Sequence, residues 1–153
     1  MYARDILTRP VVTVRPETPL PEAIVLLTEH GFAALPVIDD AEHVLGMLSE
    51  SDALGAGSAL HTATVEAVMA VPAQVVHPGT AVATIATRML DHHLRSLPVV
   101  EAGVLVGIVA RRDLLRALAH ADTDIEAKIR ALLDIYAGSR PVRTVAALRF
   151  TYA

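Results

Sequence analysis

The stretch GMLSESDAL, residues 46–54, returns later in the chain as GIVARRDLL, residues 107–115. Each copy follows a short apolar segment at a similar distance, ALPV at 34–37 and SLPV at 96–99. Glycine opens both stretches and aspartate stands at the same place in each, so the two stretches indicate an internal repeat of one structural unit.

The repeat extends well beyond these stretches. Residues 3–54 align with residues 65–115 with a single one-residue gap. Identical pairs at matching positions include Pro10/Pro72, Val14/Val76, Pro16/Pro78, Thr18/Thr80, Leu35/Leu97, Gly46/Gly107 and Asp52/Asp113. Two copies are too few for a solenoid. We therefore expect two similar units that pack about a pseudo-twofold axis, each covering the exposed apolar face of the other.

Each copy predicts the same order of elements, β-α-β-β-α, in an α/β (α+β) fold. In the first copy, apolar residues recur at helical spacing up to Gly31, a residue suited to end a helix. The strands are continuous apolar runs, as expected where helices cover a sheet. We predict an extended run, a helix, two strands and a second helix start at 12–14, 20–30, 34–38, 44–48 and Ser51–Asp52. In the second copy, the helix and the two strands fall at 82–93, 97–100 and 104–109.

The repeats divide the chain into residues 1–60, residues 61–121 and a tail at 122–153. A helix is expected at 122–136, because five residues share one apolar stripe there: Ile125, Ile129, Leu132, Leu133 and Tyr136. Apolar and polar residues then alternate, which predicts a strand within 145–152. The apolar stripe must be covered, either by helices of the repeats or by a second subunit.

The composition excludes several classes of protein. The chain is 53% hydrophobic, with a mean hydropathy of +0.46, so it can form a core. Its net charge of −4 and the lack of a basic cluster argue against a nucleic-acid partner. The absence of cysteine excludes disulfides, thiol nucleophiles and cysteine-bound zinc. Neither a signal peptide nor an apolar run that could span a membrane is present, so we expect a cytoplasmic protein without a membrane partner.

These motifs resemble the CBS-domain family, and their tandem arrangement resembles a Bateman module, over about residues 3–119. The first copy has the family pattern of glycine, hydrophobic, any residue, Ser or Thr, two residues and Asp, running from Gly46 to Asp52. The second copy departs from it at Ala110, where the family often has Ser or Thr. The tail resembles the opening helix and strand of a BON domain, which follows paired CBS domains in some bacterial proteins.

The resemblance implies a regulatory module, not an enzyme, that requires no cofactor. It implies that AMP, ADP, ATP or S-adenosylmethionine binds in two clefts between the repeats. The motif Asp would hold the ribose hydroxyls, the motif Ser or Thr would reach the phosphate, and the first strand of the opposite repeat would lie beside them. The candidate residues are Ser49, Asp52, Val75, Val76 and His77 for one cleft, and Asp113, Thr13, Val14 and Arg15 for the other.

General chemistry is consistent with these roles. A carboxylate can accept two hydrogen bonds from a cis-diol. Arg111 and Arg112, next to the motif, and Arg95, just before SLPV, could hold phosphate through bidentate contacts. The first cleft should therefore favour ribose plus phosphate, and the second should prefer a more highly charged nucleotide or stay empty. The same local sequence also suits helix capping by Ser51 or Asp52, with Asp113 in the same role, so both interpretations stay open.

Two other functions fit parts of the sequence. One is a structural interaction module that binds no small ligand. The other is a metal-dependent phosphoesterase, suggested by Asp91-His92-His93, although adjacent helical side chains point about 100° apart and suit no single ion. We expect the module to form a homodimer and to act on an effector protein that the sequence does not identify.

Overall fold

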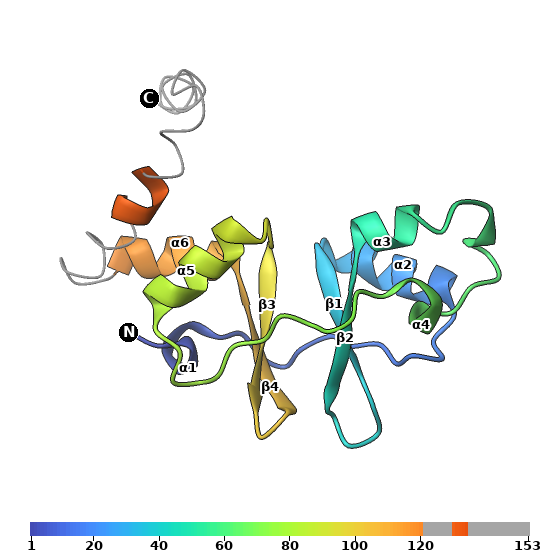
Figure 1. Ribbon diagram of the computed structural model, residues 1–153, viewed down its shortest axis with the longest axis horizontal. Helices are drawn as coiled ribbons and strands as arrows, with labels where there is room; N and C mark the ends of the chain where they lie inside the picture. The colour runs from blue at the N-terminus through green and yellow to red at the C-terminus, as the bar shows by residue number, and fades with distance from the viewer. Residues whose placement is uncertain (121–129, 135–153) are drawn as a thin grey trace.

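The computed structural model describes residues 1–120 and 130–134, and it shows the expected mixed fold of helices and small sheets (Figure 1). The elements follow the chain in this order: α1 (Ala3–Ile6), α2 (Leu20–His30), β1 (Ala34–Ile38), β2 (Val44–Ser49), α3 (Glu50–Leu54), a 3₁₀ turn (Gly57–Ala59), α4 (Val65–Val68), α5 (Val82–Asp91), β3 (Ser96–Glu101), β4 (Val104–Ala110) and α6 (Arg111–His120). A helix, a hairpin and a second helix therefore occur twice, so the two repeats share one topology, as predicted.

Each repeat contributes one antiparallel hairpin. The pairing of β1 with β2 places Ala34 opposite Ser49, and the pairing of β3 with β4 places Ser96 opposite Ala110. The register shifts once in each hairpin, directly after the valine of the Leu-Pro-Val segment. In both repeats, the fourth residue of the glycine-to-aspartate motif (Ser49 or Ala110) therefore lies opposite the residue before Leu-Pro-Val (Ala34 or Ser96).

The extended run expected before each main helix forms less sheet than predicted. Only Val14 of that run pairs with β1: its N–H donates to the Pro36 carbonyl (3.1 Å), and its carbonyl accepts from the N–H of Ile38 (2.9 Å). Val76 makes the same parallel bridge to β3 in the second repeat. The ladder stops here because the chain turns at Pro16, which has no N–H to donate.

The opening segment of each repeat pairs with the other repeat. Thr8, which follows α1, exchanges two backbone hydrogen bonds of 2.8 and 3.0 Å with Ile108 in β4. Ala70, which follows α4, exchanges two of 3.1 and 2.8 Å with Met47 in β2. These contacts are reciprocal, so they relate the two halves by the expected pseudo-twofold axis.

Figure 1 shows the same exchange at the level of helices, because α1 lies in the half that contains β3 and β4. Ala3 of α1 is fully buried in the core of that half. Val65 of α4 is fully buried in the core of the half that contains β1 and β2. Each spatial half therefore combines most of one repeat with the opening segment of the other.

The motif glycine of each repeat permits this close approach. A Cβ atom at Gly46 would lie 2.7 Å from the carbonyl oxygen of Ala70, and one at Gly107 would lie 2.8 Å from Cδ1 of Leu7. A side chain at either position would force its neighbour to move: the backbone of Ala70 at Gly46, and the side chain of Leu7 at Gly107. The two glycines therefore serve the close packing of the two repeats.

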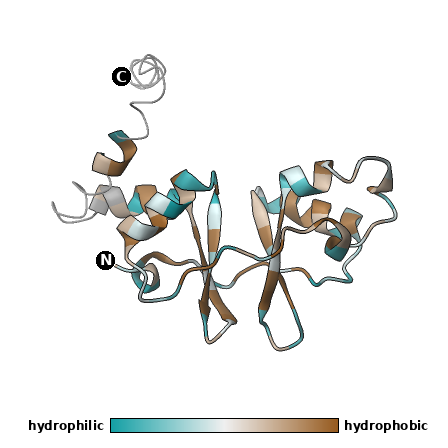
Figure 2. Cartoon of the chain, in the orientation of Figure 1, coloured by the Kyte–Doolittle hydropathy of each residue, from teal (hydrophilic) through white to brown (hydrophobic). Residues whose placement is uncertain are grey.

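Each half has its own aliphatic core, and Figure 2 shows the apolar residues concentrated in the strands and the helices that flank them. The largest buried side chains of one half are Leu20, Leu35, Leu48, Val37 and Val65, and those of the other are Ile85, Met89, Leu97, Val76, Val82 and Val99. Val14 and Val76, both expected at a ligand, belong to these cores.

The helix bounds agree with the sequence prediction in some places and differ in others. The expected bounds of α2 are confirmed, and Gly31 ends it in the left-handed conformation (φ 64°). By contrast, α5 ends at Asp91 instead of His93, because His93 itself has a positive φ of 54°. The predicted cap of α3 at Ser51 or Asp52 is wrong, since the helix begins at Glu50 with Ser49 as its N-cap.

Only residues 130–134 of the tail are described, and they are helical as expected. Leu132 packs against the core of the half that contains β3 and β4, whereas Leu133 is 39% exposed. The rest of the predicted tail helix and the predicted strand at 145–152 lie outside the described residues. In the described part of the chain, no helix has the length and apolar character needed to cross a membrane.

Candidate ligand-binding clefts

Two clefts of similar size lie between the repeats, with volumes of about 300 and 290 Å³. We name them the Asp52 cleft and the Asp113 cleft after their motif aspartates. Their linings match position by position across the pseudo-twofold axis: Met47/Ile108, Ser49/Ala110, Glu50/Arg111, Ser51/Arg112, Asp52/Asp113, Ala70/Thr8, Pro72/Pro10, Ala73/Val11, Gln74/Val12, His93/Gly31 and Leu94/Phe32. Both repeats contribute to each cleft, so a ligand in either one would contact both.

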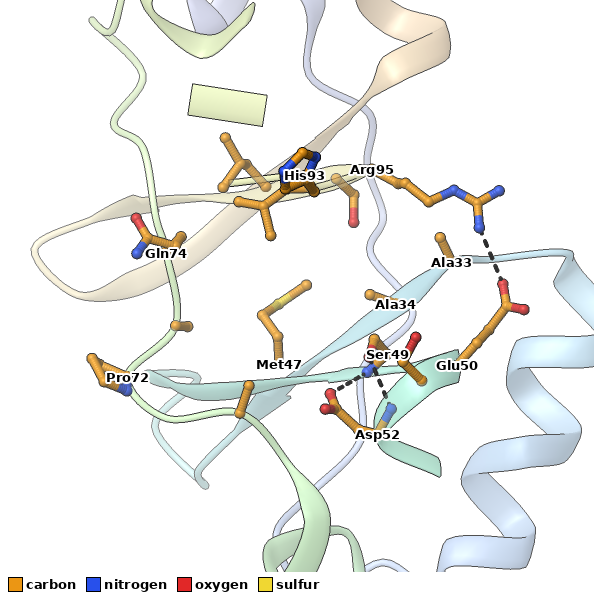
Figure 3. A pocket seen from close by; sticks show the side chains of 16 residues that line it. Ala33, Ala34, Met47, Ser49, Glu50, Asp52, Pro72, Gln74, His93 and Arg95 are labelled. Atoms are coloured by element: carbon orange, nitrogen blue, oxygen red, sulfur yellow. Dashed lines mark hydrogen bonds and ion pairs between the residues drawn. The ribbon is translucent and has the colours of Figure 1, made fainter. Parts of the chain in front are cut away.

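Four residues line both clefts: Ala33, Ala34, Arg95 and Ser96. They form the segments that lead into β1 and β3. Figure 3 shows the Asp52 cleft, with Ser49 and Asp52 on one side and His93 and Arg95 on the other. The shared segments therefore form the wall that separates the two clefts.

Asp52 and Ser49 cap each other at the start of α3. The Ser49 hydroxyl oxygen accepts from the N–H of Asp52 (3.1 Å), and Oδ2 of Asp52 accepts from the N–H of Ser49 (2.9 Å). This capping box satisfies two backbone donors that the helix leaves without partners. Since it uses one carboxylate oxygen, it leaves Oδ1 of Asp52 outside the box. Capping and ligand binding are therefore compatible roles for this residue.

Asp113 is in a more enclosed position and is only 3% exposed. Its Oδ2 accepts from the N–H of Ala110 (2.7 Å), and its Oδ1 accepts from the Thr8 hydroxyl (3.2 Å) and lies 3.9 Å from Nη1 of Arg116. Both oxygens thus have partners within the protein. Thr8 was missed by sequence reasoning, because it reaches Asp113 only through the exchange of opening segments.

The structure places the expected strand residues away from the clefts. Val76 is fully buried in the core, and the ring of His77 bonds the carbonyl of Val100 (3.0 Å) within the same repeat. Ala73 and Gln74 line the Asp52 cleft instead of Val75, Val76 and His77. The second repeat contributes this wall of the Asp52 cleft, as expected. The residues that line it, however, come directly before Val76, the residue that pairs with β3.

The Asp113 cleft shows the same displacement. Val11 and Val12 line it instead of Thr13, Val14 and Arg15. Val14 is buried because it pairs with β1. Arg15 forms an ion pair with Asp40 in the turn between β1 and β2. Pro10 and Pro72, an identical pair directly before the lining segments, were the signal in the sequence that could have placed them.

Among the described residues, three arginines line the clefts. Arg111 and Arg112 line the Asp113 cleft, and Arg95 lines both. Nε of Arg111 donates to the carbonyl of Leu94 (3.0 Å), which fixes its guanidinium. Arg95 pairs with Glu50 across the Asp52 cleft at 3.6 Å, as Figure 3 shows.

Ser96 has a buried polar atom that sequence reasoning did not single out. Its hydroxyl oxygen is inaccessible to solvent and has no hydrogen-bond partner among residues 1–120 and 130–134. A buried hydroxyl without a partner costs about 1–3 kcal/mol. Ser96 lines both clefts, but its hydroxyl oxygen is not accessible from either one in this conformation, so the cost falls on the fold.

The Asp91-His92-His93 string does not gather metal ligands. His93 lines the Asp52 cleft, whereas Asp91 and His92 are exposed and lie outside the residues that line it. In the described ranges, no three His, Asp or Glu side chains lie close enough together to hold a metal ion.

Known proteins share this sequence pattern. The model of one family, described as CBS domain, matches residues 3–59 and 65–120. The matches end before the tail, so its resemblance to a BON domain is not supported. Hypoxic response protein 1 of Mycobacterium tuberculosis is 32% identical over 76% of this chain and 84% of its own length.

Solved structures share the fold. CBSX2 of Arabidopsis thaliana in complex with AMP has a TM-score of 0.73 and 31% identity, over 78% of this chain and 96% of that chain. The CBS domain pair of protein MJ0100, in complex with 5′-methylthioadenosine and S-adenosylmethionine, has a TM-score of 0.71 and 25% identity, over 78% and 97%. A structure of Hypoxic Response Protein I with two zinc ions has a TM-score of 0.68 and 31% identity, over 76% and 98%.

Proposed function

The chain belongs to the CBS-domain family, and we propose that its two repeats form a regulatory module that binds an adenosine-containing ligand between them. The observation that carries the proposal is the pair of matched clefts, each built from both repeats and each containing the motif aspartate. The AMP, 5′-methylthioadenosine and S-adenosylmethionine held by solved relatives support this class of ligand.

The lining residues supply the three kinds of contact that an adenosine compound needs. Apolar side chains accept the base: Met47 in one cleft, and Ile108, Val11 and Phe32 in the other. Oδ1 of Asp52 can accept a hydrogen bond from a ribose hydroxyl. The arginines of the Asp113 cleft suit a phosphate group, because guanidinium binds phosphate through parallel hydrogen bonds.

Binding would act on the relation between the repeats. A ligand that touches both repeats stabilises the packing in which both sets of contacts are made. On this proposal the module is non-catalytic, acts in the cytoplasm as a homodimer and passes the change on to an effector protein. AMP, ADP, ATP and S-adenosylmethionine are the candidate ligands.

A ligand-free interaction module is the second candidate. The hydrogen bonds of Asp113 favour this alternative for the Asp113 cleft, since one carboxylate oxygen already accepts from Thr8 and the other from Ala110. Ala110 also lacks the motif hydroxyl. The Asp52 cleft shows neither feature, and the arginines of the Asp113 cleft still suit a phosphate group, so this alternative rests only on the missing ribose contact of one cleft.

Isothermal titration calorimetry on purified protein freed of bound small molecules tests the proposal. Titration with AMP, ATP and S-adenosylmethionine should give saturable binding by at least one of them. GTP is the control for the base, because it carries the same ribose and phosphates. Absence of binding by all three adenosine compounds at millimolar concentration would favour the ligand-free module.

A further inference from the structure

The two clefts have the same architecture but opposite charge. At two matched positions the Asp52 cleft has Glu50 and Ser51, whereas the Asp113 cleft has Arg111 and Arg112. The Asp52 cleft is therefore lined by two carboxylates, Glu50 and Asp52, and one guanidinium, Arg95. The Asp113 cleft is lined by three guanidinium groups and one carboxylate.

Equivalent backbone contacts hold the two oppositely charged residues in place. The N–H of Glu50 donates to the carbonyl of Ala33 (3.1 Å), and the N–H of Arg111 donates to the carbonyl of the matching residue, Arg95 (3.1 Å). The backbones of Glu50 and Arg111 therefore occupy equivalent positions in the two repeats, and each residue lines its own cleft. The difference in charge is a property of the side chains alone.

The charges within each cleft reinforce the difference. In the Asp52 cleft the guanidinium of Arg95 is paired with Glu50, so it offers less to a phosphate. In the Asp113 cleft both carboxylate oxygens are already bonded, to Thr8 and Ala110, and Oδ1 lies 3.9 Å from Nη1 of Arg116, so the carboxylate is less available to repel a phosphate. Arg111 and Arg112 are exposed at the opening.

We infer that the two clefts sort adenosine compounds by charge: the Asp113 cleft takes an adenine nucleotide with its phosphates, and the Asp52 cleft takes an adenosine compound that has no phosphate. The inference rests on the proposed function and refines it. It also departs from the sequence expectation that the Asp52 cleft favours ribose plus phosphate, because Glu50 would repel a phosphate there.

Calorimetry with ATP and adenosine as the two probes tests this assignment. One ATP should bind per chain, and R112Q should weaken ATP binding at least tenfold while leaving adenosine binding unchanged. R111Q should act in the same way, but it also breaks the bond to Leu94, so R112Q is the cleaner variant. R4Q is the matched control, because Arg4 is exposed on α1 and lines neither cleft.

A charge reversal provides the converse test. E50R places an arginine at the position that matches Arg111, and it should raise the ATP stoichiometry from one to two per chain. Loss of ATP binding in D52N but not in R112Q would overturn the assignment of clefts. Equal losses of ATP and adenosine in folded R112Q would overturn sorting by charge, yet leave the proposed function intact. If neither ATP nor adenosine binds the wild-type protein, sorting by charge is overturned, and the proposed function fails as well only if AMP and S-adenosylmethionine do not bind either.

Discussion

Ser49 and Asp52 form a reciprocal capping box at the first turn of α3, and both residues line the same cleft. The Ser49 hydroxyl and Oδ2 of Asp52 therefore stabilise the start of the helix, while Oδ1 of Asp52 takes no part in the capping box. The structural role and the proposed ligand role of this aspartate can be separated by substitutions that remove one role and keep the other.

D52N should keep the fold and lose affinity. The amide oxygen of Asn can still accept from the N–H of Ser49, so thermal unfolding should stay close to wild type. The affinity for adenosine should fall at least tenfold, since hydrogen bonds to a charged group contribute about 1.5–3 kcal/mol. D52A should lose the box as well, at about 1 kcal/mol of stability. Equal adenosine affinity of wild type and D52N in calorimetry would leave Asp52 with a capping role only.

G46A should destabilise the protein through the contact between the two repeats. Its Cβ would lie 2.7 Å from the carbonyl oxygen of Ala70, so the exchanged segment after α4 would have to move. We expect a loss of about 1–3 kcal/mol in the free energy of unfolding, measured with urea. G79A is the matched control, because its Cβ would meet only Nη1 of Arg4 at 3.8 Å. A similar stability of both variants would argue against close packing at Gly46.

S96A should stabilise the ligand-free protein, because it removes a buried hydroxyl that has no partner in the described part of the chain. The expected gain is about 1 kcal/mol in the free energy of unfolding. The reverse substitution A34S, at the matching position of the first repeat, is the control. A loss of stability in S96A would show that the hydroxyl already has a partner.

Light scattering should show a dimer at micromolar concentration. Four large apolar side chains on the described helices are exposed in the single chain: Val25 (49%), Leu54 (77%), Leu115 (62%) and Leu133 (39%). Burial of such residues in a second copy removes apolar surface from water. Deletion of residues 122–153 tests the tail, and unchanged dimerisation would assign the contact to helices of the repeats. A monomer for the full chain would refute the homodimer.

Much of the fold could be predicted because the signals are local. The bounds of α2 and β1 follow from apolar periodicity and from Gly31, which alone of the neighbouring residues adopts a positive φ at little cost. The exchange of opening segments could not be predicted, because it depends on contacts between distant residues. Thr8 and Asp113, for example, are separated by 105 positions.

The candidate site was predicted in part for the same reason. Asp52, Asp113 and Arg111 belong to a local motif or lie next to it, so the resemblance to the family was enough to place them at the clefts. Gln74 and Val12 line the clefts because they lie two residues before Val76 and Val14, which pair with β3 and β1. A shift of two or three residues along this segment moves a side chain from the core to the cleft. The matched prolines, Pro10 and Pro72, mark the start of these segments, but the apolar pattern that follows them does not distinguish core from cleft.

The most direct test of the account is the map of backbone amide chemical shifts on addition of AMP, measured by NMR on ¹⁵N-labelled protein. The account predicts saturable shifts at Ala33, Ala34, Arg95 and Ser96, which line both clefts and so respond whichever cleft is occupied. The residues of the occupied cleft, either Ser49–Asp52 or Ala110–Asp113, should shift with them. Shifts confined to surfaces away from these residues, or no saturable shifts at all, would contradict binding between the repeats.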